Sequence, residues 1–196
     1  MDRERLRELH CIMPIQNIPS VMDVGILSHQ RAETVTHESV ADPEIQARRA
    51  RVRVPGGRAL HEYANLYLDA RNPMMYRRKE SHATLTVLSI DPSVLDLPGV
   101  VVTDRNAAVD FVRWAPAPTG LAIVDEALAY AERWTHENLI EETRRKQAKQ
   151  AEVLVPERVA PKFIRGAYVS CAAAQDALAA LDTGCRIRLR PRLFFR

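Results

Sequence analysis

The sequence lacks the glycine patterns that hold phosphates in the common nucleotide-binding folds. It has seven glycines, and the only close pair, Gly56 and Gly57, belongs to neither a GxGxxG turn nor a P-loop. A GxSxG elbow is also absent, and His61-Glu62 is followed by Asn65 where a zincin helix needs a histidine. These absences argue against a Rossmann-type or P-loop site, an α/β-hydrolase and a zinc protease.

Cysteines and long apolar runs are scarce as well. Cys11, Cys171 and Cys185 are an odd number without ligand spacing, so we expect three free thiols and no metal site. The apolar runs are short and the first eight residues are mostly charged, which fits neither a membrane helix nor a secretory signal. With 196 residues, 46% of them hydrophobic, the chain is expected to form one cytoplasmic domain over residues 1–196, without membrane attachment.

Arginine, by contrast, is abundant and clustered. The net charge is only +3, yet 24 of the 28 basic residues are arginine, with clusters at 48–58, 144–149 and 186–196. Guanidinium groups suit phosphates, so the clusters are compatible with a dinucleotide or a nucleic-acid ligand. A solvated charged surface is the simpler explanation of the composition alone.

Short strands and short helices alternate irregularly along the chain. Strands are predicted at 9–15, 61–69, 83–90, 100–103, 151–155, 167–171 and 186–189. Helices are predicted between Asn17 and Gly25, and at 44–51, 121–134, 137–150 and 172–181. This irregular order predicts a mixed α/β or α+β domain rather than a doubly wound sheet.

Four blocks of sequence carry a family resemblance. Residues 60–76 combine a histidine-acid-tyrosine strand with a following arginine and a Pro-Met-Met-Tyr segment. Residues 45–49 precede a Pro-Gly-Gly turn, 102–106 read Val-Thr-Asp-Arg-Asn, and 149–155 place a glutamate on an apolar strand. In this order, the blocks resemble the DarT family of DNA ADP-ribosyltransferase toxins over residues from about 9 to 172.

The resemblance implies an ADP-ribosyltransferase fold, in which split, mainly antiparallel sheets and flanking helices surround an NAD cleft. It implies an enzyme that uses NAD as co-substrate and transfers ADP-ribose to thymine or guanine in single-stranded DNA. It also implies a macrodomain antitoxin, similar to DarG, as a partner. Two alternatives stay open: an ADP-ribosyltransferase with an RNA or protein acceptor, and a non-enzymatic nucleic-acid-binding domain.

Carried over residue by residue, the resemblance assigns catalysis to Glu152 and Arg49. A carboxylate at Glu152 is suited to stabilise the oxocarbenium-like ribose that forms as the nicotinamide bond breaks. It is also suited to help remove a proton from the attacking base. The planar fork of Arg49 is suited to hold the pyrophosphate or to align the acceptor base.

The implied NAD contacts lie along the first strand and helix and in the signature block. Besides Arg49 they are His10, Cys11, Asn17, Gly25, Leu27, Tyr67, Arg71, Met74 and Tyr76. Cys11 stands where many members have a histidine, so either His10 substitutes for it or the backbone makes the contact. Asn106 also replaces a frequent histidine, and these departures leave the acceptor base open.

The basic helix predicted at 137–150 directly precedes the strand of Glu152. Its Arg145, Lys146 and Lys149 are therefore expected to follow the phosphates of single-stranded DNA. Arg51 and Arg53 offer a second surface for the acceptor strand. A solvated helix face is the alternative explanation for the basic helix.

Overall fold

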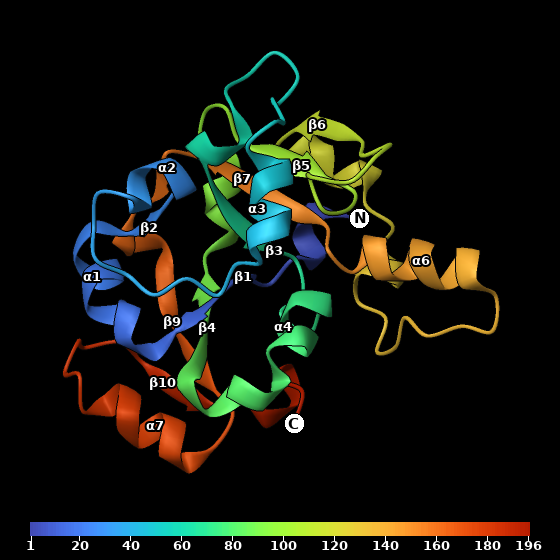
Figure 1. Ribbon diagram of the computed structural model, residues 1–196. Helices are drawn as coiled ribbons and strands as arrows, with labels where there is room; N and C mark the ends of the chain where they lie inside the picture. The colour runs from blue at the N-terminus through green and yellow to red at the C-terminus, as the bar shows by residue number, and fades with distance from the viewer.

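The computed structural model describes all 196 residues and is built around an eight-stranded sheet (Figure 1). Its strands follow the order β10-β9-β4-β1-β3-β7-β5-β6, and every neighbouring pair is antiparallel except β10 and β9. The strands are β1 (Leu9–Pro14), β3 (Tyr63–Tyr67), β4 (Leu85–Ile90), β5 (Val101–Thr103), β6 (Trp114–Pro116), β7 (Glu152–Pro156), β9 (Ile164–Val169) and β10 (Ile187–Leu189). The mixed fold class with a mainly antiparallel sheet is therefore confirmed.

The sheet is divided between β1 and β3. β1 pairs with β4 along its whole length, but it shares only the pair His10–Tyr67 with β3. β3 and β7, in turn, pair over all five residues. The two strands therefore separate beyond one point of contact, and this leaves one half of β10-β9-β4-β1 and another of β3-β7-β5-β6.

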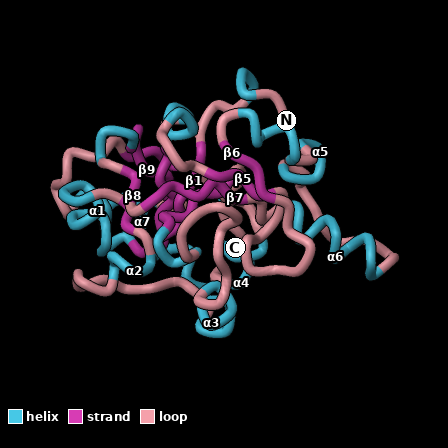
Figure 2. The backbone as a smooth tube through the Cα atoms, turned by 90° about the horizontal axis from the view of Figure 1, so that it is seen from above, coloured by secondary structure: helices cyan, strands magenta, loops and turns pink.

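Helices and a small second sheet surround these two halves. The helices are α1 (Ile18–Val24), α2 (His29–Ala32), α3 (Pro43–Arg49), α4 (Pro73–Arg77), α5 (Glu126–Ala129), α6 (Leu139–Ala148) and α7 (Ala172–Ala179), and the small sheet pairs β2 (Ile26–Leu27) with β8 (Arg158–Val159). Seen from above, α3 lies on one side of the strands, and the N-terminus and α5 lie on the other (Figure 2). No helix is long and apolar enough to span a membrane.

Two Asx-Pro pairs start the helices that flank the later site. Asp42 accepts hydrogen bonds from the first backbone amides of α3, and Asn72 does the same for α4. Proline in the first helical turn loses no hydrogen bond, because the amides there have no partner within the helix. Asn72 is fully buried and also donates to the carbonyl of Asp69, so it joins β3 to α4. Local sequence thus fixes where both helices begin.

Several elements lie within a few residues of their predicted ranges: the strands β1, β4 and β7 and the helices α1, α3, α6 and α7. The single helix predicted at 121–134 is wrong. In its place are a 3₁₀ turn (Thr119–Ile123) and the one-turn helix α5, which starts afresh where Asp125 accepts a hydrogen bond from the Leu128 amide. The strand β6 had no predicted counterpart, because the prolines around it are unusual in strand interiors.

Gly25, between α1 and β2, gives a test of this architecture. Its φ is +92°, and a Cβ atom there would lie 2.3 Å from the Val159 carbonyl oxygen. Gly25→Ala is therefore expected to lower the free energy of unfolding by at least about 2 kcal/mol. Gly56 is the matched control, because its φ is +67° but nothing lies within 4 Å of the added Cβ. Gly56→Ala should cost about 1 kcal/mol in urea unfolding, and equal losses in the two variants would contradict the steric argument.

Candidate functional site

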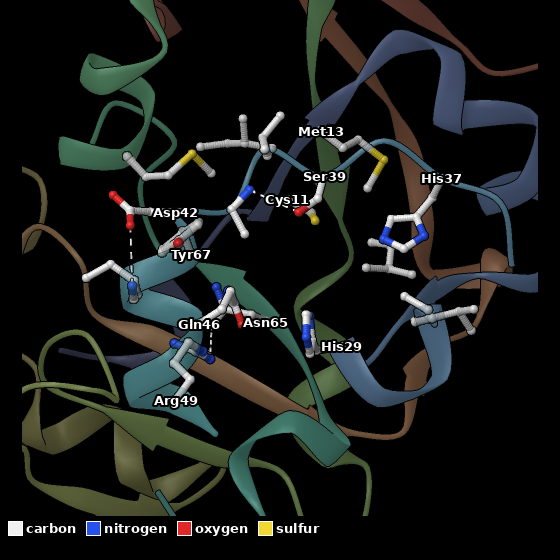
Figure 3. A pocket seen from close by; sticks show the side chains of 18 of the residues that line it. Cys11, Met13, His29, His37, Ser39, Asp42, Gln46, Arg49, Asn65 and Tyr67 are labelled. Carbon is white, nitrogen blue, oxygen red and sulfur yellow. Dashed lines mark hydrogen bonds between the residues drawn. The ribbon is translucent and has the colours of Figure 1, made fainter. Parts of the chain in front are cut away.

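A cleft of about 380 Å³ lies where the two halves of the sheet separate. Cys11 and Met13 line it from β1, and Asn65 and Tyr67 line it from β3. Figure 3 shows Arg49, Gln46 and Asn65 on one side of this cleft and His29 and His37 on the other. Its volume is within the range of pockets that bind small molecules and cofactors.

Arg49 and Glu152 form an ion pair beside this cleft. Nη1 of Arg49 lies 3.1 Å from both carboxylate oxygens of Glu152, and its Nη2 lies 3.5 Å from Oδ1 of Asn65. The Glu152 side chain has no exposed surface, and the Arg49 side chain is 8% exposed. The structure thus brings together the two residues that the resemblance assigns to catalysis, although 103 positions separate them.

The surroundings of Glu152 have opposing effects on its charge. Burial raises the pKa of its carboxyl group, whereas the charge and hydrogen bonds of Arg49 and the Ala107 backbone oppose that rise. Its own backbone amide donates to Oγ1 of Thr103, the residue paired with it on β5. Arg49 lines the cleft but Glu152 does not, so a ligand would meet the guanidinium before it met the carboxylate.

Two polar side chains of the cleft lining carry a buried atom without a hydrogen-bond partner. They are Oε1 of Gln46 on α3 and Nε2 of His61, just before β3. The His61 ring lies 4.1 Å from the His29 ring, and burial together with the charge of His29 lowers its pKa. Because buried polar atoms are normally paired, these two are suited to bind a polar ligand.

Six of the predicted NAD contacts, besides Arg49, line the cleft: Cys11, Asn17, Gly25, Leu27, Tyr67 and Met74. The Asn17 side chain exchanges two hydrogen bonds with the backbone of Glu38, which fixes the segment before α3 against the cleft. Burial raises the pKa of Cys11 to about 12, so its thiol stays protonated and is a poor nucleophile.

His10 is also a predicted NAD contact, but it does not line the cleft. It projects into the protein, where Nδ1 lies 3.2 Å from the Leu68 carbonyl oxygen and Nε2 lies 3.3 Å from the Glu8 carboxylate. The same carboxylate accepts from Tyr168 and Ser89. His10 is therefore part of an internal polar group, and a register shift that would place it in the cleft does not occur.

Arg71 and Tyr76 lie outside the cleft lining too, so the structure does not bring these two predicted NAD contacts to the cleft. Arg71 donates to the Phe194 carbonyl at 2.7 Å, and its guanidinium lies 3.9 Å from the centre of the Phe195 ring. Tyr76 makes edge contacts with Trp134 and Phe195. These two side chains therefore hold the C-terminal segment, which lies beside α4 in the fold.

The basic helix α6 fits its predicted role only in part. Lys149 is 2% exposed and pairs with Asp69 at the end of β3, so its assignment to phosphate binding is wrong. Arg145 lies 3.3 Å from Glu141 on the same helix, whereas Lys146 is exposed and lines the cleft. Arg51 and Arg53 are exposed on the segment that follows α3.

The sequence reasoning missed the segment 35–42, which supplies a large part of the lining. It has neither helical nor strand periodicity and no catalytic motif, so the only local signal was the Asp42-Pro43 helix start at its end. Gln46 was missed for a different reason. A lone glutamine on a short helix does not reveal from its spacing that it will face a cleft.

The chain matches a known protein family over nearly its whole length. Residues 10–194 match the family described as ssDNA thymidine ADP-ribosyltransferase, DarT. A DNA ADP-ribosyl transferase-DNA ADP-ribosyl glycohydrolase fusion protein of Thermosipho africanus (strain H17ap60334) is 32% identical over 174 residues, which are 85% of this chain and 43% of that protein. This chain thus spans less than half the length of that relative.

Solved structures of Thermus sp. 2.9 DarT share the fold. The complex with ADP-ribosylated ssDNA superposes with a TM-score of 0.83 at 22% identity, and covers 97% of both chains. The complex with NAD+ gives a TM-score of 0.79 at 21% identity, and covers 97% of this chain and 98% of that one. Because the family match extends over residues 10–194, nearly the whole length, this chain belongs to the DarT family.

Proposed function

We propose that this chain, as one domain over residues 1–196, transfers ADP-ribose from NAD to a base in single-stranded DNA, with Glu152 and Arg49 as its catalytic residues. The observation that carries the proposal is the buried ion pair of these two residues beside a cleft of about 380 Å³. The family description, and the relatives bound to NAD+ and to ADP-ribosylated ssDNA, support the same reaction. The acceptor base is proposed to be thymine, in line with the family description, with guanine as the alternative.

The cleft residues fit a dinucleotide. The unpartnered Oε1 of Gln46 and Nε2 of His61 are available for its polar groups, and Asn17, Tyr67 and Met74 are available to enclose its rings. Gly25, just after α1, and Leu27, on β2, also line the cleft. NAD, when bound, supplies the ADP-ribosyl group and nicotinamide as the leaving group.

Glu152 and Arg49 then have separate tasks. Once a ligand draws the guanidinium aside, the carboxylate of Glu152 accepts a hydrogen bond from a ribose hydroxyl and stabilises positive charge that develops on the sugar. Because the Glu152 side chain has no exposed surface, solvent screens this charge only weakly. Arg49 is placed to hold a phosphate or an acceptor base through its planar fork.

On the acceptor side, Lys146, Arg51 and Arg53 are proposed as the phosphate contacts. All three are exposed, and Lys146 also lines the cleft. Arg145 shares its charge with Glu141 and contributes less. The name of the Thermosipho africanus relative joins a transferase to a DNA ADP-ribosyl glycohydrolase, and this supports a macrodomain partner that removes the modification.

The direct test is incubation with labelled NAD and a panel of DNA and RNA oligonucleotides, followed by mass analysis. We expect ADP-ribose on one kind of base in single-stranded DNA and none on RNA. Glu152→Gln should lower the transfer rate by a factor of about a hundred or more. Glu152→Ala should in addition lower the free energy of unfolding by about 3 kcal/mol, because it leaves Arg49 buried without a partner. Products on RNA or protein alone would contradict the DNA assignment, and the absence of nicotinamide release would contradict enzymatic activity.

Arg49 and its neighbour Arg48 form a matched pair for a second test. They are adjacent on α3, but Arg49 is buried at the cleft and Arg48 is exposed. Arg49→Ala should reduce transfer at least about tenfold, whereas Arg48→Ala should leave it nearly unchanged, since adjacent helical residues point about 100° apart. Equal losses would mean that the arginine cluster acts only through general phosphate attraction.

The salt dependence of DNA binding tests the acceptor side. Lys146→Gln should weaken oligonucleotide binding and reduce the slope of log K against log salt concentration by about 0.7, the value for one contact with a single strand. Lys162→Gln is the control, because it removes the same charge from an exposed position outside the cleft lining. An unchanged slope for Lys146→Gln would remove this residue from the DNA surface.

A further inference from the structure

The segment between β5 and β6, residues 104–113, exposes an aromatic ring where the fold gains nothing from it. The Phe111 side chain is 93% exposed and its φ is +58°. Phenylalanine disfavours this left-handed region, which glycine and asparagine adopt more readily. Both the side chain and the backbone are thus unfavourable in the isolated protein, and a strained residue of this kind is a reason to look for a function.

The segment is held firmly at both ends. The Asp104 carboxylate accepts hydrogen bonds from the guanidinium of Arg105 and from the backbone amide and Nε of Arg113. The Asp104 amide in turn donates to the Arg113 carbonyl. Because Asp104 is buried, these contacts close the base of the segment. Phe111 is therefore presented on an anchored turn.

The segment 104–113 starts directly after Thr103, the residue that lies opposite Glu152. Thr103 pairs with Glu152 across β5 and β7, accepts a hydrogen bond from its amide and donates to the Arg105 carbonyl. Asn106 and Val109, farther along the turn, line the cleft. Phe111 follows Val109 by two residues, so their Cα atoms are at most about 7 Å apart. The backbone of Phe111 is therefore within about 7 Å of a residue that lines the cleft.

We propose that Phe111 stacks on the nucleobase next to the acceptor base when single-stranded DNA enters the cleft. A base in a single strand exposes a flat face, and an aromatic side chain on an anchored turn supplies a matching surface without sequence preference. The exposed Arg113 beside it is suited to bind the adjoining phosphate. This inference rests on the proposed function and adds the contact that holds the DNA while the acceptor base reaches Glu152.

The test compares Phe111→Asn, Phe111→Trp and Leu189→Ala with the wild type. Asparagine removes the ring and tolerates the left-handed backbone, so this variant should melt no lower than the wild type. Leu189→Ala is the matched control, because Leu189 is 46% exposed on β10, at the opposite edge of the sheet from β6. The readouts are the affinity for a fluorescent single-stranded 20-mer of mixed sequence, the affinity for NAD, and the KM for DNA in the transfer assay.

We expect Phe111→Asn to weaken binding of the 20-mer about tenfold and to raise the KM for DNA, with NAD affinity unchanged. Phe111→Trp should keep the 20-mer affinity and the KM for DNA near the wild-type values, and Leu189→Ala should change neither. If Phe111→Asn binds the 20-mer as the wild type does, the stacking contact is overturned, while transfer by the wild type would still uphold the proposed function. Conversely, weaker binding by Phe111→Asn, with restoration by tryptophan, supports the stacking contact even if no ADP-ribose is transferred.

Discussion

The buried ion pair of Arg49 and Glu152 is the interaction on which the cleft depends. A carboxylate without exposed surface is unfavourable unless a positive charge and hydrogen bonds compensate it. Arg49 supplies that charge from α3, so the position of this short helix is tied to the central strand β7. Removal of either partner would leave a buried charge, which typically costs about 3–5 kcal/mol. The residues assigned to catalysis are therefore also structural.

The division of the sheet gives this pair its access to a ligand. On one side, β3 and β7 pair throughout and hold Tyr67 and Asn65 beside Glu152. On the other side, β1 leaves β3 after the single pair His10–Tyr67. If β1 and β3 paired along their whole length, the cleft between them would close. A ligand in the cleft thus contacts both halves of the sheet, and its binding stabilises their relative position.

Sequence alone predicted those parts of the fold that depend on neighbouring residues. The Asp42-Pro43 start of α3 and the apolar strands β1, β4 and β7 are local signals, and the motif blocks pointed to Arg49 and Glu152, which the structure brings together as an ion pair. Side-chain direction was not predictable in this way. Lys149 is buried because Asp69 meets it from 80 positions away. Arg71 turns from the cleft because the C-terminal carbonyls lie within its reach.

Gly25 and Phe111, two residues with positive φ, show how fold and function constrain a sequence differently. Gly25 must be glycine, because any Cβ atom would collide with the Val159 carbonyl. Phe111 also has a positive φ, but its bulky ring makes almost no contact with the rest of the protein. The fold constrains only the backbone at this position. A side chain that the fold does not require, two residues from the cleft-lining Val109, is best explained by a contact with a molecule outside the chain.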